Sequence, residues 1–98
     1  MEIKKNQNGT VLTLSLVGRL DTVTAPDLEA ALAESLDGIE QLVLDLAELE
    51  YISSAGLRVL LASQKKMSGK GGMVVKNPNA DVSEVFEITG FADILTIE

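Results

Sequence analysis

A repeated switch between two hydrophobic periods constrains the fold of this chain more than any other feature. From Thr10 to Val17, leucines alternate with less apolar residues, and a period of two is typical of a strand with one apolar face. From Thr24 to Asp37, leucines recur at every fourth position, which places them on one face of a helix. The switch recurs further along the chain. Strands that alternate with helices predict an α/β fold with a mixed, mostly parallel sheet.

The expected order of elements is ββαβαβα, with a possible final strand. We expect strands over 2–6, 10–17, 39–52 and 73–76. We expect helices over 24–37, from the serine pair at 53–54 to about 67, and over 82–89. The tail from 91 to 98 is apolar enough for a last strand or a strap. The chain has 98 residues with no linker or repeat, so we expect a single domain, residues 1–98, with four to five strands and three helices.

Local patterns add detail to these elements. Asn8-Gly9 is a strong signal for a two-residue hairpin turn, and the short, charged strand before it is typical of a sheet edge. Thr24 and Asp27 have the spacing of a capping box at a helix start. The run over 39–52 is almost continuously aliphatic, which favours a strand covered on both faces.

The sequence contains neither cysteine nor histidine. A disulfide, a thiolate nucleophile, a Cys/His metal site and a histidine general base are therefore excluded. The acidic residues do not have the spacing of a calcium loop. We expect a protein that is not an enzyme, with no catalytic residue, no metal site and no cofactor.

The formal net charge of −7 disfavours nucleic acid as a partner, because affinity for it comes from neutralising phosphates. It disfavours anionic membranes for the same reason. The first ten residues, "MEIKKNQNGT", lack the apolar core of a signal peptide. No apolar run approaches the roughly 20 residues that span a bilayer. We expect a cytoplasmic protein with no direct membrane insertion and no nucleic-acid partner.

Two serines stand at the junction between the strand over 39–52 and the next helix, in "YISSAGLRVLL". A serine before a helix can simply cap it. A hydroxyl at a helix start can also accept a phosphoryl group, because free amides and the helix dipole favour a dianion there. A nucleophilic serine would need a base and a G-x-S-x-G elbow, and the sequence has neither histidine nor that pattern.

The sequence does not match two other classes of protein that bind or accept phosphate, namely nucleotide-binding proteins and response-regulator receivers. The segment "GKGG" lacks the glycine spacing and the following hydroxyl of a nucleotide-binding loop. A response-regulator receiver would need a phosphoacceptor aspartate at a strand end together with paired acids, but Asp45 lies inside its predicted strand.

Three segments in the right order resemble the STAS domain family, named for sulfate transporters and anti-sigma factor antagonists. Residues 18–25, "GRLDTVTA", resemble the family's early G-x-L-D-x-x-(T/S)-A segment. Residues 52–61, "ISSAGLRVLL", resemble its D-S-S-G-L core. Residues 71–91 resemble its Gly-rich turn, strand and final helix. The resemblance covers nearly the whole chain and implies the STAS fold.

Short, free-standing members of this family are typically bacterial anti-sigma factor antagonists (anti-anti-sigma factors). The resemblance implies a partner switch, in which the unmodified antagonist binds an anti-sigma factor that is also a serine kinase and so releases a sigma factor. The kinase then phosphorylates the antagonist on one serine, which ends the complex. A metal-dependent serine phosphatase resets the antagonist. The resemblance also favours a monomer.

The resemblance assigns the phosphorylated serine to Ser54, with Ser53 as the alternative acceptor. The expected partner-binding residues are Asp21, Thr22, Ser53, Ser54, Gly56, Leu57 and Arg58. Simpler roles stay open for three of them. Asp21 could close a turn, Gly56 could serve packing, and Arg58 could be a solvated helix residue.

Two positions depart from the family pattern. Ser53 stands where the family core often has Asp, and Ala55 stands where it often has Ser. The missing aspartate favours an alternative function, that of a non-phosphorylated STAS accessory subunit in a transporter or a sensory assembly.

Overall fold

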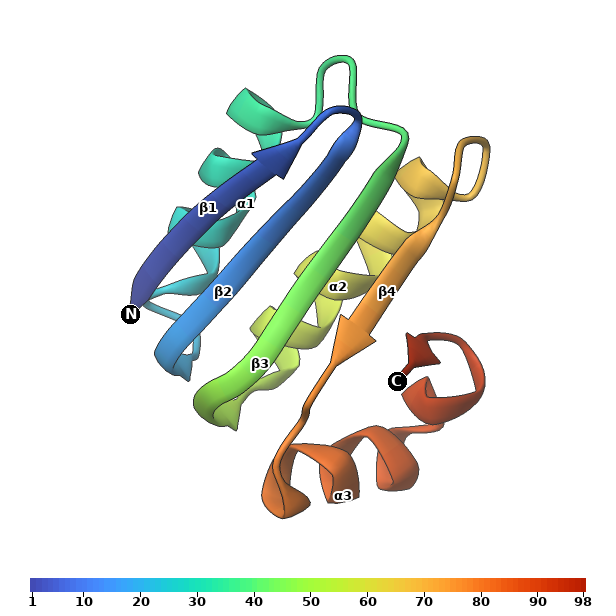
Figure 1. Ribbon diagram of the computed structural model, residues 1–98. Coiled ribbons are helices and arrows are strands. Elements are labelled where there is room, and N and C mark those ends of the chain that lie inside the picture. Colours follow the sequence, from blue (N-terminus) through green and yellow to red (C-terminus); the bar gives the residue numbers. More distant parts are fainter.

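The computed structural model describes residues 1–98 and contains five strands, three α-helices and one short 3-10 helix (Figure 1). The strands are β1 (Glu2–Asn8), β2 (Val11–Leu20), β3 (Gln41–Ile52), β4 (Met73–Lys76) and β5 (Thr96–Ile97). The helices are α1 (Ala25–Ser35), α2 (Ser54–Met67), α3 (Ala80–Thr89) and the 3-10 helix η1 (Phe91–Asp93). None of the helices combines the length and the apolar character needed to cross a membrane.

The five strands form one sheet in the order β1-β2-β3-β4-β5. β1 is antiparallel to β2 and lies at an edge, whereas β2 to β5 run parallel to one another. The predicted α/β class, the mixed and mostly parallel sheet and the three helices are therefore confirmed. The tail adopts the strand alternative, because β5 pairs with β4.

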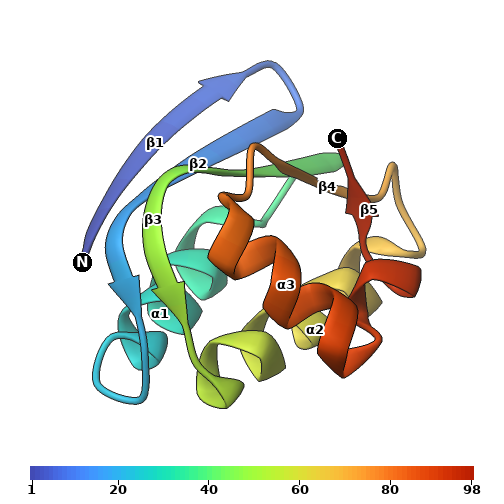
Figure 2. The same ribbon diagram turned by 90° about the horizontal axis from the view of Figure 1, so that it is seen from below.

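The helices lie on one face of the sheet, and Figure 2 shows no helix over the opposite face. The prediction that the strand over 39–52 is covered on both faces is thus wrong. Val43 of β3 pairs with Val74 of β4, and both line a hollow on the open face. They are nevertheless only 8% and 9% exposed. Neighbouring strands shield these branched side chains, so an aliphatic run does not require a second helical layer.

Leucines of β2 and β3 form the floor of the core. Leu12 is paired with Leu42, and Leu14 with Leu44, and all four are 2% exposed or less. α1 and α2 cover this floor with apolar residues that recur at helical spacing and are buried, as the sequence predicts. α3 adds Phe86 to the same core. Burying one such side chain contributes about 1.5–3 kcal/mol, so this layer of leucines holds α1 and α2 against the sheet.

The hairpin between β1 and β2 differs from its prediction by one residue. Asn8 pairs with Val11, so the two loop residues are Gly9 and Thr10. Gly9 has a φ of +64°, and Thr10 is not among the residues with positive φ. A glycine at the first loop position is the arrangement of a type II′ turn, which moves Thr10 out of the predicted strand.

The predicted capping box at the start of α1 is wrong. Thr24 precedes α1, but its side chain makes no cap bond to the helix. Its hydroxyl instead accepts the amide of Asp21 at 2.8 Å and donates to the carbonyl of Arg19 at 2.8 Å. The hydroxyl therefore closes the loop between β2 and α1.

β3 contains two irregularities relative to β2. Ser15 pairs with Asp45 and Leu20 pairs with Ile52, so the six residues 15–20 of β2 lie beside the eight residues 45–52 of β3. Extra residues of this kind bend a strand and redirect its side chains. They place Arg19 opposite Tyr51, next to the end of both strands.

Candidate functional site

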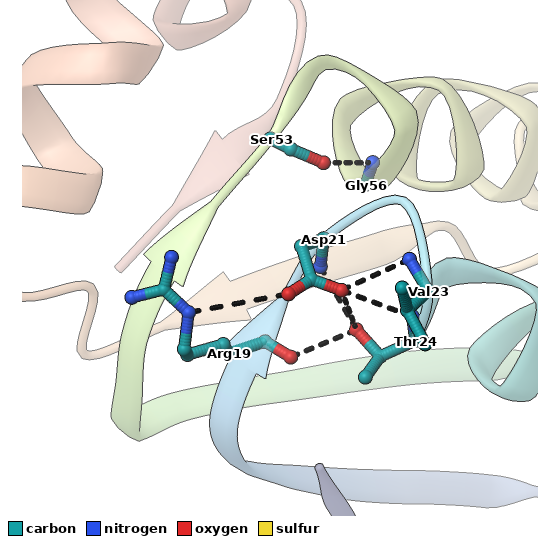
Figure 3. Close-up of polar contacts among 6 residues, drawn as sticks. All are labelled: Arg19, Asp21, Val23, Thr24, Ser53 and Gly56. Atoms are coloured by element: carbon teal, nitrogen blue, oxygen red, sulfur yellow. Dashed lines mark hydrogen bonds and ion pairs between the residues drawn. The ribbon is translucent and has the colours of Figure 1, made fainter.

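The carboxyl ends of β2 and β3 lie side by side at one edge of the sheet. Leu20 is the last residue of β2, and its carbonyl accepts the amide of Ser53 at 2.9 Å. The loop before α1 and the junction before α2 are therefore neighbours, as Figure 3 shows. In open α/β sheets this edge is where functional groups gather.

Ser53 is the N-cap of α2, and all its polar groups are engaged. Its backbone is extended, with φ −99° and ψ 175°. Its Oγ accepts the amide of Gly56 at 3.4 Å (Figure 3), and its carbonyl accepts the amide of Leu57 at 2.9 Å. The helix-cap interpretation therefore applies to Ser53. The hydroxyl supplies, without charge, the cap acceptor that an aspartate could supply at this position.

Ser54 is the first residue of α2, and it is exposed. The backbone amides of Ser54 and Ala55 donate to no acceptor. Such free amides, together with the helix dipole, give this end of α2 a positive partial charge. The first turn of α2 contains no acidic residue that would compensate it. An exposed hydroxyl thus stands at a helix end that can accommodate an anion.

Asp21 closes the loop in which it lies. Its Oδ1 accepts the amides of Val23 at 3.0 Å and Thr24 at 3.1 Å, and its Oδ2 lies 3.9 Å from Nε of Arg19 (Figure 3). The hydrogen bond from the Thr24 amide is the largest cause that lowers the pKa of Asp21 below its ordinary 3.8. The turn-closing role considered for Asp21 is therefore present in the structure.

Gly56 and Leu57 are buried under the site rather than exposed on it. A Cβ atom placed on Gly56 would lie 2.7 Å from Cγ of Leu20 and 3.0 Å from Cγ1 of Ile52. The packing role considered for Gly56 is thus present as well. These two residues hold the first turn of α2 against the ends of β2 and β3.

Thr22 and Arg58 are exposed and lie on either side of the same hollow. This hollow has a volume of about 380 Å³ and runs between α1 and α2, with Ala55 also in its lining. Arg58 forms no ion pair, so its guanidinium is available to another molecule. Thr22, Ser54 and Arg58 are the predicted site residues that the structure leaves accessible.

Two features of this edge were not predicted from the sequence. The guanidinium of Arg19 lies over the ring of Tyr51, 4.3 Å from its centroid, and the bulges of β3 that create this contact have no local sequence signal. Val23, at the tip of the β2–α1 loop, is 82% exposed. The sequence does contain a signal for this exposure, because Val23 is a single valine between two threonines in a predicted turn.

The site holds no group of three acidic side chains that could bind a metal ion, and neither does the rest of the molecule. What it offers is an exposed hydroxyl, a positive helix end and a free arginine beside a shallow groove. This arrangement suits phosphoryl acceptance and protein contact.

Comparison with known proteins identifies similar chains. The family model described as the STAS domain matches residues 2–98. BtrV of Bordetella bronchiseptica, described as a candidate anti-sigma factor antagonist, is 39% identical over 99 residues, which cover 99% of this chain and 85% of BtrV.

Solved structures have the same fold. The crystal structure of an anti-sigma factor antagonist from Mycobacterium paratuberculosis superposes with a TM-score of 0.88 at 29% identity, covering 98% of this chain and 83% of that one. The anti-sigma factor antagonist SpoIIAA, solved in its unphosphorylated form, gives a TM-score of 0.84 at 16% identity, with coverage of 99% and 88%. SpoIIAA of Bacillus has also been solved in a phosphorylated form.

Proposed function

This chain belongs to the STAS domain family, and on that premise we propose that it is an anti-sigma factor antagonist. It is a regulatory protein, not an enzyme, and residues 1–98 act as one domain. It binds an anti-sigma factor that is also a serine kinase, and this binding releases a sigma factor in the cytoplasm. The descriptions of BtrV and of the Mycobacterium protein support binding to an anti-sigma factor.

Ser54 is the residue that the kinase phosphorylates. The observation that carries this assignment is the division of roles between the two serines. Ser53 uses its amide, carbonyl and hydroxyl to join α2 to the sheet, whereas Ser54 is exposed and its hydroxyl bonds to nothing. A kinase can therefore reach the Ser54 hydroxyl without breaking the cap of α2.

Phosphorylation turns binding off through charge. A phosphoserine carries about −1.5 to −2 charges at neutral pH. The positive end of α2 accommodates this charge within the fold, so the antagonist stays folded. A partner docked over Ser54 must instead desolvate the dianion or face it with its own charges, and each 1.4 kcal/mol lost weakens binding about tenfold. A serine phosphatase restores the binding form.

The contact surface consists of the accessible residues of the site. Thr22, Ser54 and Arg58 touch the partner. Asp21, Ser53, Gly56 and Leu57 contribute by fixing the loop and the helix end from which these side chains project. Substitutions of Gly56 and Leu57, which are buried, therefore act on the contact surface only through its shape.

The proposal is tested by capture from a lysate of the source organism, with identification by mass spectrometry. The baits are the wild-type chain, Ser54→Ala, Ser54→Asp and Ser53→Asp. Ser53→Asp is the matched control, because it adds the same charge one residue earlier, at an N-cap where aspartate is favourable. We expect wild type, Ser54→Ala and Ser53→Asp to retain an anti-sigma factor kinase and Ser54→Asp to lose it.

Two outcomes contradict the proposal. Equal loss with Ser53→Asp and Ser54→Asp means that added charge acts without regard to position. Retention of the same transporter or sensory proteins by every bait supports the accessory-subunit function instead.

A further inference from the structure

The hairpin between β1 and β2 contains an asparagine followed by a glycine, Asn8-Gly9. Both residues are exposed. The backbone amide of Gly9 donates to no acceptor, and the side chain of Asn8 takes part in no hydrogen bond. A Cβ atom placed on Gly9 would have nothing within 4 Å, so the space around this residue is open. The side-chain amide of Asn8 therefore precedes a backbone nitrogen that neither a hydrogen bond nor a neighbouring group shields.

These two groups can react with each other, and asparagine is among the residues that decay chemically on heating. Once a base in solution removes its proton, the nitrogen of Gly9 attacks Cγ of Asn8. A bond forms between this nitrogen and Cγ, the bond from Cγ to Nδ2 breaks, and Nδ2 takes a proton from solvent and leaves as ammonia. The product is a five-membered cyclic imide. Water then opens the imide at one of its two carbonyls, which leaves an aspartate linked to Gly9 through its α-carboxyl or its β-carboxyl group.

The position of Asn8 in the hairpin allows the ring to close. Cγ of Asn8 meets the Gly9 nitrogen only when the Asn8 backbone leaves the extended conformation of a strand. Asn8 forms the last pair of β1, with Val11, and the ends of elements open at the lowest cost in free energy. Gly9 has a φ of +64° and no Cβ atom that would restrict the movement. Opening one terminal pair is therefore enough to bring the two atoms together.

Two of the other three asparagines are held in ways that oppose this reaction. Asn77 precedes Pro78, whose nitrogen has no proton to lose. Asn79 uses both polar atoms of its side chain. Its Oδ1 accepts the amide of Val82 at 2.8 Å, and its Nδ2 donates to the carbonyl of Leu49 at 3.0 Å. The side chain of Asn79 must break both bonds before its Cγ can move.

Asn6 is the closest comparison, because it is exposed in the same strand. The residue that follows it is Gln7, whose side chain crowds the approach to its own nitrogen. Gln7 also pairs with Leu12 inside the ladder, so the Asn6 backbone can leave the extended conformation only if more than the last pair opens. Among the asparagines of this chain, Asn8 alone combines an open neighbouring nitrogen, a free side chain and a terminal position.

We propose that Asn8 is a site of spontaneous deamidation, with water as the only co-reactant. Each event replaces a neutral amide by a carboxyl group that is ionised at neutral pH, so the chain gains one negative charge. The β-linked product also adds one atom to the backbone of the hairpin. Since β2 is the only strand that pairs with β1, this extra atom disturbs the attachment of an edge strand.

The modification does not depend on the proposed function. The hairpin precedes Val11 at the start of β2, whereas Ser53 bonds to Leu20 at the end of β2. Figure 1 shows the hairpin and the start of α2 at opposite ends of the sheet. Deamidation at Asn8 therefore leaves the surroundings of Ser54 unchanged.

The test incubates the purified, folded chain in mildly alkaline buffer at a temperature below unfolding. Isoelectric focusing detects the added charge, and peptide mass spectrometry locates the exchange of an NH for an oxygen atom. The variant Asn8→Gln places its amide one methylene further along the side chain, and Asn6→Gln is the matched control in the same strand. Asp37 also precedes a glycine, but an imide there returns to the same mass and charge on hydrolysis, so it does not affect either readout.

The wild-type chain unfolded in guanidinium chloride gives the time that the reaction takes without the hairpin. The folded proteins are incubated for several times that period. Circular dichroism at the end verifies that they remained folded.

We expect folded wild type and Asn6→Gln to form one more acidic species, with the mass change on the peptide that contains Asn8. Asn8→Gln should lose this species. Two results overturn the proposal. Absence of the acidic species from folded wild type, after the unfolded chain has converted, would show that the hairpin protects Asn8. Conversion that is mapped first to Asn6, Asn77 or Asn79 would show that the reactive asparagine lies elsewhere.

Discussion

Gly56 lies against Leu20 so closely that a Cβ atom on Gly56 would be 2.7 Å from Cγ of Leu20. The first turn of α2 therefore rests directly on the end of β2. The same junction is fastened by the hydrogen bond from Ser53 to the Leu20 carbonyl. Together these contacts set where the Ser54 hydroxyl stands relative to the β2–α1 loop.

Gly56→Ala should destabilise the protein by about 1–3 kcal/mol, because the added methyl group overpacks a buried contact. Urea unfolding followed by circular dichroism measures the change. Gly69→Ala is the control, since a Cβ atom there meets nothing within 4 Å and its φ is not positive. Equal stability of the two variants would contradict this account of the α2–β2 contact.

Asp21 should make stability depend on pH in the acidic range. Its pKa is lowered in the folded protein, chiefly by the Thr24 amide. Between that lowered value and the ordinary 3.8, the unfolded chain binds more protons than the folded one, so stability falls as the pH falls through this window. The free energy of unfolding, measured by urea denaturation at several pH values in this window, should change less with pH for Asp21→Asn than for wild type. The same pH dependence in both proteins would argue against a loop closed by Asp21.

Ser53→Ala should cost about 0.5–1 kcal/mol, at the lower end of the range for caps, because its cap bond is long at 3.4 Å. Asn79 caps α3 with a bond of 2.8 Å and also donates to the Leu49 carbonyl at 3.0 Å. Asn79→Ala should therefore be the more destabilising of the two, by thermal unfolding. The reverse order would show that Ser53 contributes more than its hydrogen bonds indicate.

Arg19 and Tyr51 should be energetically coupled. A guanidinium over an exposed ring contributes about 0.5–1 kcal/mol, and the distance of 4.3 Å to the centroid is within range. A double-mutant cycle with Arg19→Ala and Tyr51→Ala isolates this energy from the effects of each substitution alone. Strict additivity of the two substitutions would mean that the stack contributes nothing in solution.

Most of the fold could be predicted from hydrophobic period. β4 has the predicted ends, and Asn79 and Gly90 bound α3 as a side-chain cap and a left-handed C-cap. The capping-box error arose because the side chain has a partner in the preceding loop and not in the helix. Thr24 has the spacing of a capping residue, but its hydroxyl bonds within the β2–α1 loop.

For the candidate site, the sequence predicts a location, the serine pair at 53–54, but not the contacts that surround it. The serine pair was found from the junction of two periods, but only the hydrogen bonds distinguish the engaged Ser53 from the exposed Ser54. The stack of Arg19 on Tyr51 depends on the bulges of β3. The hollow between α1 and α2 depends on the distance between the two helices, which no local sequence pattern indicates.

The most direct test of the central claim is to map phosphate on the chain. The anti-sigma factor retained by the wild-type chain is incubated with ATP and magnesium and with wild type, Ser53→Ala or Ser54→Ala, and intact mass spectrometry counts the phosphates added. We expect wild type and Ser53→Ala to gain one phosphate each and Ser54→Ala to gain none. A phosphate on Ser54→Ala, together with its absence from Ser53→Ala, would contradict the assignment of Ser54 as the switch.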